Sequence, residues 1–135
     1  RLVPFHTAHK LLLLAHNDAA YRRLGKLVGS AGTLPDAELF ARYEAEFQNA
    51  LRTKATVQKH VNVLQHAMGH LKTMLNAIEK REVLGAINDY RAGLLPLIVP
   101  MTLMRYNIRR HGIEYLAGQL YFDPHPKELM LRNHA

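Results

Sequence analysis

The sequence has no cysteine among its 135 residues. Disulfides, thiolate nucleophiles and cysteine-held iron–sulfur clusters are therefore excluded from this chain. The absence also fits a reducing compartment, so we expect a cytoplasmic protein. The apolar run LLLLA at Leu11–Ala15 is far shorter than the roughly 20 residues that span a membrane, and no signal-peptide layout precedes it. The sequence begins with Arg1 rather than methionine, which leaves open that it is a fragment of a longer protein.

Strand patterns and the common catalytic motifs are missing too. β-branched residues are sparse, strict alternation of apolar and polar residues is absent, and there is neither a phosphate-cradling glycine loop nor a nucleophile elbow. We therefore lean against an enzyme and expect no cofactor. The hydrophobic fraction of 48% and the charged fraction of 21% predict a globular chain. Its length suits a single domain, residues 1–135, around one core.

The composition has an excess of positive charge, with a formal net charge of +7. Such a balance favours nucleic acid or another anion as partner, although basic surfaces without a ligand are common. Apolar periodicity and turn residues predict an all-α domain of six or seven helices. The segments expected to be helical are residues 5–16, 19–28, 37–52, 54–76 and 79–91, one from near Pro100 to Gly112, a short one at 114–122, and a last one from Pro126.

Three histidines lie in KATVQKHVNVLQHAMGH, Lys54 to His70. At about 100° per residue, His60 falls in the apolar arc of its helix, which predicts a core histidine hydrogen-bonded to a buried partner. His66 and His70 fall near 240° and 280° from it, with Lys59 between them at about 260°. These three side chains form one polar stripe. The stripe is better interpreted as an edge that faces phosphates than as a zinc site, because zinc needs a third protein ligand and Lys59 adds a repelling charge.

Two further histidines, His9 and His16, share a face of the first predicted helix. We expect structural histidines with satisfied nitrogens. The alternative is an enzyme pocket that combines them with His60 and His125, which requires the imidazoles to face one cavity.

Clusters of arginine are the strongest indication of an anionic partner. Arg105 and Arg109 lie four apart, so they share a helix face, and Arg110 follows directly. A second cluster contains Arg22 and Arg23. Guanidinium groups match phosphate geometry well, so these side chains are the candidates for contacts with RNA. The other interpretation is a basic surface that only faces water.

Four segments resemble the YbgA-like family, catalogued as a domain of unknown function: HKLLLLAHNDAAYRRLGKLV, KATVQKHVNVLQHAMGH, YRAGLLPLIVPMTLMRYNIRR and YLAGQLYFDPHPKELMLRNH. The resemblance runs in order from about Phe5 to His134. The family motif maps onto Lys54, Lys59, His60, Asn62, His66, Arg91, Pro96, His125, Pro126, Glu128, Arg132 and Asn133. His70 and the pair Tyr106-Asn107 depart from it.

In this family the domain occurs alone or as the C-terminal half of longer bacterial proteins, whose N-terminal half is a cysteine-rich desulfidase-type domain acting on thiolated uracil. The resemblance implies an accessory role beside that chemistry, through binding of thiouridine-bearing tRNA. We therefore expect an RNA-binding accessory domain. The alternatives are a protein-interaction domain that docks on a catalytic partner and, with less support, the enzyme with a histidine-lined pocket.

Overall fold

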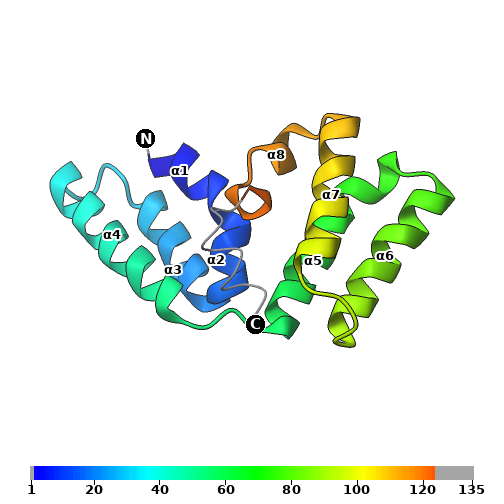
Figure 1. The fold of residues 1–135 in the computed structure, drawn as a ribbon. Helices are drawn as coiled ribbons and strands as arrows, with labels where there is room; N and C mark the ends of the chain where they lie inside the picture. Colours follow the sequence, from blue (N-terminus) through cyan, green and yellow to red (C-terminus); the bar gives the residue numbers. More distant parts are fainter. Residues whose placement is uncertain (1, 124–135) are drawn as a thin grey trace.

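The computed structural model describes residues 2–123, which fold into eight α-helices and two 3-10 helices with no β-strand among them (Figure 1). The all-α prediction is thus confirmed. None of the helices in this part of the chain combines the length and the apolar character needed to cross a membrane. The elements are α1 (Leu2–Ala8), α2 (Lys10–His16), α3 (Asp18–Gly29), α4 (Asp36–Arg52), α5 (Val57–Leu71), η1 (Lys72–Met74), α6 (Ala77–Arg91), α7 (Ile98–His111), α8 (Glu114–Ala117) and η2 (Leu120–Phe122).

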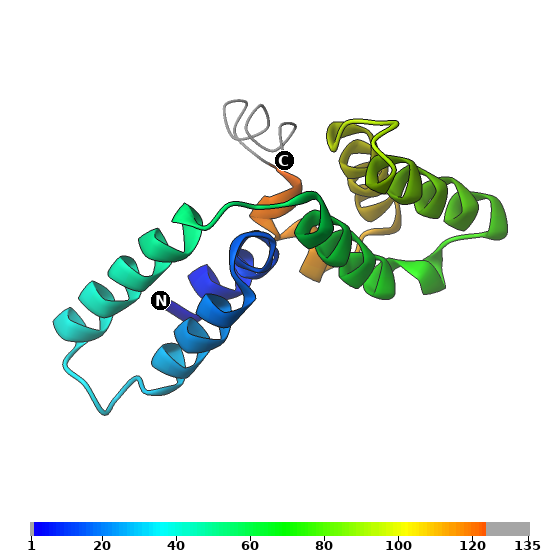
Figure 2. The same ribbon diagram turned by 90° about the horizontal axis from the view of Figure 1, so that it is seen from below.

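The helices form two lobes that meet where α2 packs on α5 (Figures 1 and 2). Helices α1 to α4 make one lobe, and α5, α6 and α7 make the other, with α8 and η2 near the junction. The buried side chains follow this division and form two clusters rather than the single expected core. Leu11 of α2 belongs to the larger cluster, with α5, α6 and α7, whereas Leu13 belongs to the smaller one, with α3 and α4.

The first predicted helix, residues 5–16, is interrupted at His9. A distant side chain supports this break: the Gln119 amide accepts from the backbone N–H of Leu11 at 3.1 Å and donates to the carbonyl of Thr7 at 2.6 Å. Gln119 is only 2% exposed. Its two hydrogen bonds satisfy backbone groups at the end of α1 and the start of α2 that a continuous helix would have paired internally. This break is one reason why the helix count exceeds six or seven.

Local capping sets several helix ends as expected. The Asn17 side chain accepts from the N–H of Ala20 at 3.0 Å and caps α3. Gly112 ends α7 with a φ of 61°, in the left-handed region that glycine adopts without a steric penalty. Helix α5 begins at Val57 rather than at residue 54, because Thr56 caps it by accepting from the N–H of Lys59. It ends at Leu71 instead of continuing to residue 76.

Two further boundaries differ from the prediction. Helix α7 starts at Ile98, so Pro100 lies within its first turn and not at its first residue. Backbone N–H groups in the first turn have no partner inside the helix, so the missing N–H of a proline costs no hydrogen bond there. The short helix expected at residues 114–122 is divided into α8 and η2. The last helix, predicted from Pro126, lies outside the described residues.

Candidate nucleic-acid interface

Helix α5 separates its histidines as the helical count predicts. His60 is fully buried, and its Nδ1 lies 2.6 Å from the hydroxyl of Tyr121 in η2. The centroids of the two rings are 5.8 Å apart. The prediction of a core histidine with a buried partner is therefore confirmed. His66 and His70 lie on the exposed side of the same helix, with ring centroids 5.5 Å apart.

Lys59, the third member of the predicted stripe, is engaged by backbone carbonyls. Its Nζ donates to the carbonyl of His16 at 2.9 Å and to that of Lys54 at 3.1 Å. The first of these oxygens belongs to the last residue of α2, where the helix dipole favours a cation. Lys59 is half-buried and ties the start of α5 to the end of α2. These contacts favour a structural role for its ammonium group.

His66 and His70 belong to a group of cationic and aromatic side chains from four helices, which we call the Lys10 cluster: Lys10, Tyr21, His66, His70 and Tyr115. The Lys10 ammonium lies 6.0 Å from the ring centroids of both Tyr21 and Tyr115, within the range of cation–π contacts. The ring of His70 lies 5.0 Å from that of Tyr115. The cluster therefore joins α2, α3, α5 and α8.

The electrostatic environment of the Lys10 cluster is cationic. Burial lowers the pKa of His66, and the positive charges of Lys10 and His70 lower it further. Among the described residues, no carboxylate contributes to this shift. The buried hydroxyl of Tyr115 has no hydrogen-bond partner among residues 2–123. An anion at this position would meet the positive charge of Lys10.

The predicted arginines are mostly paired with carboxylates. Arg22 contacts Asp18 at 3.0 Å, and Arg23 contacts Glu46 at 3.4 Å. Arg110 pairs with Glu79, which also forms the capping box of α6 with Asn76. The hydrogen bond with the Asn76 backbone lowers the pKa of Glu79, and the neighbouring Arg110 and His111 lower it further, so this carboxylate stays charged. Arg110 therefore contributes to holding α6 against α7.

Arg105 and Arg109 are brought together, as their spacing predicts. Both line a small hollow of about 60 Å³ between α7 and the segment that contains α8 and η2. Asp123 lies at the same hollow, with its carboxylate 3.9 Å from Arg105. This distance is near the limit for an ion pair, and Arg109 has no ion pair among residues 2–123. The hollow thus presents two guanidinium groups against one carboxylate.

The histidines of the proposed pocket have separate partners. The Nδ1 of His9 lies 2.8 Å from the carbonyl of Phe5, and that of His16 lies 2.8 Å from the carbonyl of Thr53. His60 contacts Tyr121, and His125 lies outside the described residues. Separate partners are typical of structural histidines. Within residues 2–123 no group of three or more histidine and acidic side chains is arranged to hold a metal ion.

One buried histidine, His6, was not predicted from the sequence. His6 is 9% exposed, its Nδ1 lies 2.9 Å from the hydroxyl of Tyr43, and its ring stacks on Tyr21 at 4.9 Å. Burial lowers its pKa, and the charges of His9 and Lys10 add to the effect. The Nδ1 of a neutral His6 accepts a hydrogen bond from the hydroxyl of Tyr43. No local pattern marks His6, because its partner is 37 positions away.

Fold and surface together define an all-α, basic domain with a cationic and aromatic cluster where its lobes meet. The chain belongs to the family described as "Protein of unknown function (DUF1722)", whose model matches residues 10–126. It is also 28% identical over 133 residues to "Uncharacterized protein YbgA" of Escherichia coli (strain K12), across 98% of this chain and 79% of that protein. These matches confirm the resemblance to the YbgA-like family. No solved structure matches the chain.

Proposed function

We propose that this chain is an RNA-binding accessory domain that engages tRNA. The observation that carries the proposal is the Lys10 cluster, in which the Lys10 ammonium and the His70 ring both lie close to Tyr115, and His66 lies beside His70. Side chains of this kind bind RNA in two ways. Cations contact phosphates, and tyrosine or histidine rings stack on unpaired bases.

The hollow with Arg105 and Arg109 supports a second phosphate contact. Two like charges four residues apart on a helix repel each other, and a phosphate between them offsets this repulsion. Asp123 is a weak competitor at 3.9 Å. By contrast, Arg22, Arg23 and Arg110 meet RNA only if their ion pairs with carboxylates open. We therefore assign the main contacts to the Lys10 cluster and to the hollow.

The suggested partner enzyme rests on the family resemblance. A desulfidase-type domain that removes sulfur from thiolated uracil needs cysteine ligands for its iron–sulfur cluster, and this chain contains none. We infer that the chain supplies tRNA binding and a separate or fused domain supplies the chemistry. Thiouridine-bearing tRNA is the RNA expected from this arrangement.

A gel-shift titration with thiolated and unthiolated tRNA, repeated over a series of salt concentrations, tests the proposal. The wild-type chain should bind with a linear dependence of log Kd on log salt. Lys10→Ala and His70→Ala should each weaken binding, whereas Lys26→Ala, an exposed lysine of α3, serves as the matched control. If Lys10→Ala and His70→Ala both bind tRNA as tightly as the Lys26→Ala control, the Lys10 cluster is not the RNA interface. If the wild type does not bind at any salt concentration, the proposed function is wrong.

One observation favours the runner-up, a protein-interaction domain. A groove of about 340 Å³ between α5 and α6 is lined by Gln65, Met68, Gly69, Lys72, Lys80 and Leu84. Leu84 is 42% exposed and the nearby Ile78 is 65% exposed. Exposed apolar side chains beside lysines are typical of protein interfaces. This function predicts binding to a catalytic partner that depends little on salt, together with no shift of tRNA.

A further inference from the structure

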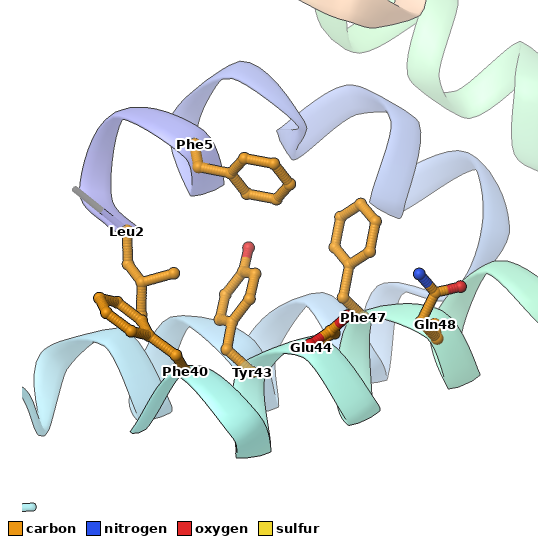
Figure 3. Close-up of a pocket in the computed structure, with 7 residues that line it drawn as sticks. All are labelled: Leu2, Phe5, Phe40, Tyr43, Glu44, Phe47 and Gln48. Atoms are coloured by element: carbon orange, nitrogen blue, oxygen red, sulfur yellow. The ribbon is translucent and has the colours of Figure 1, made fainter. Parts of the chain in front are cut away.

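A pocket between α1 and α4 is formed almost wholly by apolar and aromatic side chains (Figure 3). It has a volume of about 280 Å³ and lies in the lobe formed by α1 to α4. The lining residues are Leu2, Phe5, Phe40, Tyr43, Glu44, Phe47 and Gln48. A volume of this size suits a small organic molecule.

The aromatic rings of the pocket stand at angles to one another. Phe5 and Phe47 have centroids 5.3 Å apart with 60° between their planes, and Phe5 meets Tyr43 at 5.9 Å and 82°. Figure 3 shows Phe5 from α1 facing the Tyr43 and Phe47 side chains of α4 across the pocket. The His9 ring stacks on Phe5 at 4.0 Å, but Phe5 is still 41% exposed, so part of its surface remains open to solvent. Ring faces are the negative pole of the aromatic quadrupole and attract cations.

The hydroxyl of Tyr43 already forms a hydrogen bond with a buried histidine, His6. It lies 2.9 Å from Nδ1 of His6, and burial raises the pKa of Tyr43 to about 12, so the hydroxyl keeps its proton. A tyrosine that donates to an imidazole has a more electron-rich ring. The hydrogen bond also fixes the ring in place, which reduces the entropy lost when a ligand binds.

Charge at the pocket is opposite to that of the whole chain. Glu44 is the one charged side chain among the lining residues, whereas the chain carries +7. Its neighbours on α4 are engaged, Glu38 with Arg42 and Glu46 with Arg23. Glu44 itself is exposed and forms no ion pair within residues 2–123. A carboxylate beside aromatic rings favours a cation and repels an anion such as the phosphate of RNA.

We propose that this pocket binds a small organic cation with apolar substituents, an alkylated ammonium of the choline type. Phe5 and Phe47 contact the alkyl groups and attract the charge, the buried Tyr43 packs against both rings, and Glu44 serves as the counter-ion at the rim. The site goes beyond RNA binding and does not depend on it. An uncharged apolar group, such as a leucine side chain of a protein partner, would gain from the rings but not from Glu44.

Isothermal titration of the full chain with choline and with 3,3-dimethyl-1-butanol separates these ligands, because the alcohol has the shape of choline without its charge. Choline should bind about tenfold more tightly than the alcohol, since cation–π contacts and Glu44 act only on the charged ligand. Equal affinities would identify a simple apolar pocket and overturn the proposal. Absence of saturable binding by choline would overturn it as well.

Two variants locate the site. Glu44→Gln should weaken choline binding about fivefold and leave the binding of the alcohol unchanged. Phe47→Leu keeps the pocket apolar but removes a ring, so it should weaken choline more than the alcohol. Glu82→Gln, at an exposed carboxylate of α6, is the matched control. Because Glu44 is exposed, its variant should fold, and retained choline affinity in Glu44→Gln would contradict the assignment even if Phe47→Leu unfolds.

Discussion

The side-chain amide of Gln119 donates a 2.6 Å hydrogen bond to the backbone carbonyl of Thr7, across 112 positions of sequence. The same amide accepts from Leu11, so one buried side chain joins both ends of the break between α1 and α2 to the segment that leads into η2. Its position makes the start of the chain dependent on a residue near the end of the described region. The His60–Tyr121 hydrogen bond anchors that segment to α5.

Replacing Gln119 by leucine should destabilise the fold strongly. The substitution keeps the volume roughly constant but leaves the buried N–H of Leu11 without its partner and removes the hydrogen bond to the carbonyl of Thr7, at a cost of about 2 to 4 kcal/mol. Urea unfolding followed by circular dichroism measures the loss. Gln48→Leu, at an exposed glutamine of α4, is the control and should change the free energy of unfolding by less than about 0.5 kcal/mol. A Gln119→Leu variant as stable as this control would show that the break is held by other contacts.

The ammonium of Lys59 should matter for stability more than for RNA. Lys59→Met keeps the alkyl stem but removes the hydrogen bonds to the carbonyls of His16 and Lys54, so we expect a loss of about 1 to 2 kcal/mol in urea unfolding. Lys72→Met, at an exposed lysine after α5, should cost little. The salt dependence of tRNA binding should not change in Lys59→Met. A weaker dependence of tRNA binding on salt in Lys59→Met would instead support Lys59 as a phosphate contact.

The two arginines at the hollow should contribute to RNA binding together. Arg105→Gln combined with Arg109→Gln should weaken tRNA binding and lower the slope of log Kd against log salt by about 1.5, the value for two lost phosphate contacts. Gel shifts at several salt concentrations measure both quantities. The double variant Lys80→Gln, Arg81→Gln removes the same charge from exposed positions of α6 and is the control. Equal slopes for the two double variants would place the RNA elsewhere.

Binding of RNA to the Lys10 cluster should strengthen as the pH falls. His66 has a lowered pKa in the free chain, because burial and the charges of Lys10 and His70 disfavour its protonation, whereas a bound phosphate favours it. Binding is then linked to proton uptake, so affinity should rise between about pH 7.5 and about pH 6. The rise should be smaller in His66→Gln. An unchanged pH dependence in this variant would exclude His66 from the interface.

The pair of His6 and Tyr43 should make stability depend on pH in the same range. The pKa of His6 is lowered in the folded chain, so the unfolded state takes up the proton more readily. Stability from this group is therefore complete above the unfolded value of about 6.5 and is lost as the pH falls toward the folded value. The groups around the ring, His9, Lys10, Tyr21 and Tyr43, supply no negative charge to offset it.

The measurement is the free energy of unfolding in urea at about pH 7.5 and about pH 5.5. His6→Gln keeps a hydrogen-bond acceptor for Tyr43 but cannot titrate, so its stability should fall less between these values than that of the wild type. His134→Gln, beyond the described residues, offers a control at another histidine. An identical fall in His6→Gln and the wild type would show that His6 does not titrate in this range.

The helices were predictable where local chemistry determines them. Asn17 and Gly112 act on backbone groups within four positions, so their effects can be read from a short window of sequence. The burial of His60 and the exposure of His66 follow from the helical repeat in the same way. The break at His9 could not be predicted, because the four leucines contain no breaking residue and Gln119, which bonds to the groups on both sides of the break, lies more than a hundred positions away.

The candidate interface shows a similar limit. The spacing of Arg105 and Arg109 correctly predicted a shared face, but the pairing of Arg23 with Glu46 and of Arg110 with Glu79 depends on how helices pack. Charge that looks available in a sequence is thus neutralised by acidic residues of other helices. Lys10 and Tyr115 were missed for the same reason, since tertiary packing alone brings α2 to α8.

The helix α2 has a consequence for how the molecule unfolds. Leu11 and Leu13 point from one short helix into two different clusters, and neither cluster keeps its full set of contacts if this helix is lost. The two lobes should therefore unfold together, and a change that destabilises one lobe should lower the stability of the other. The seven residues of α2 thus couple the stability of the two halves of the chain.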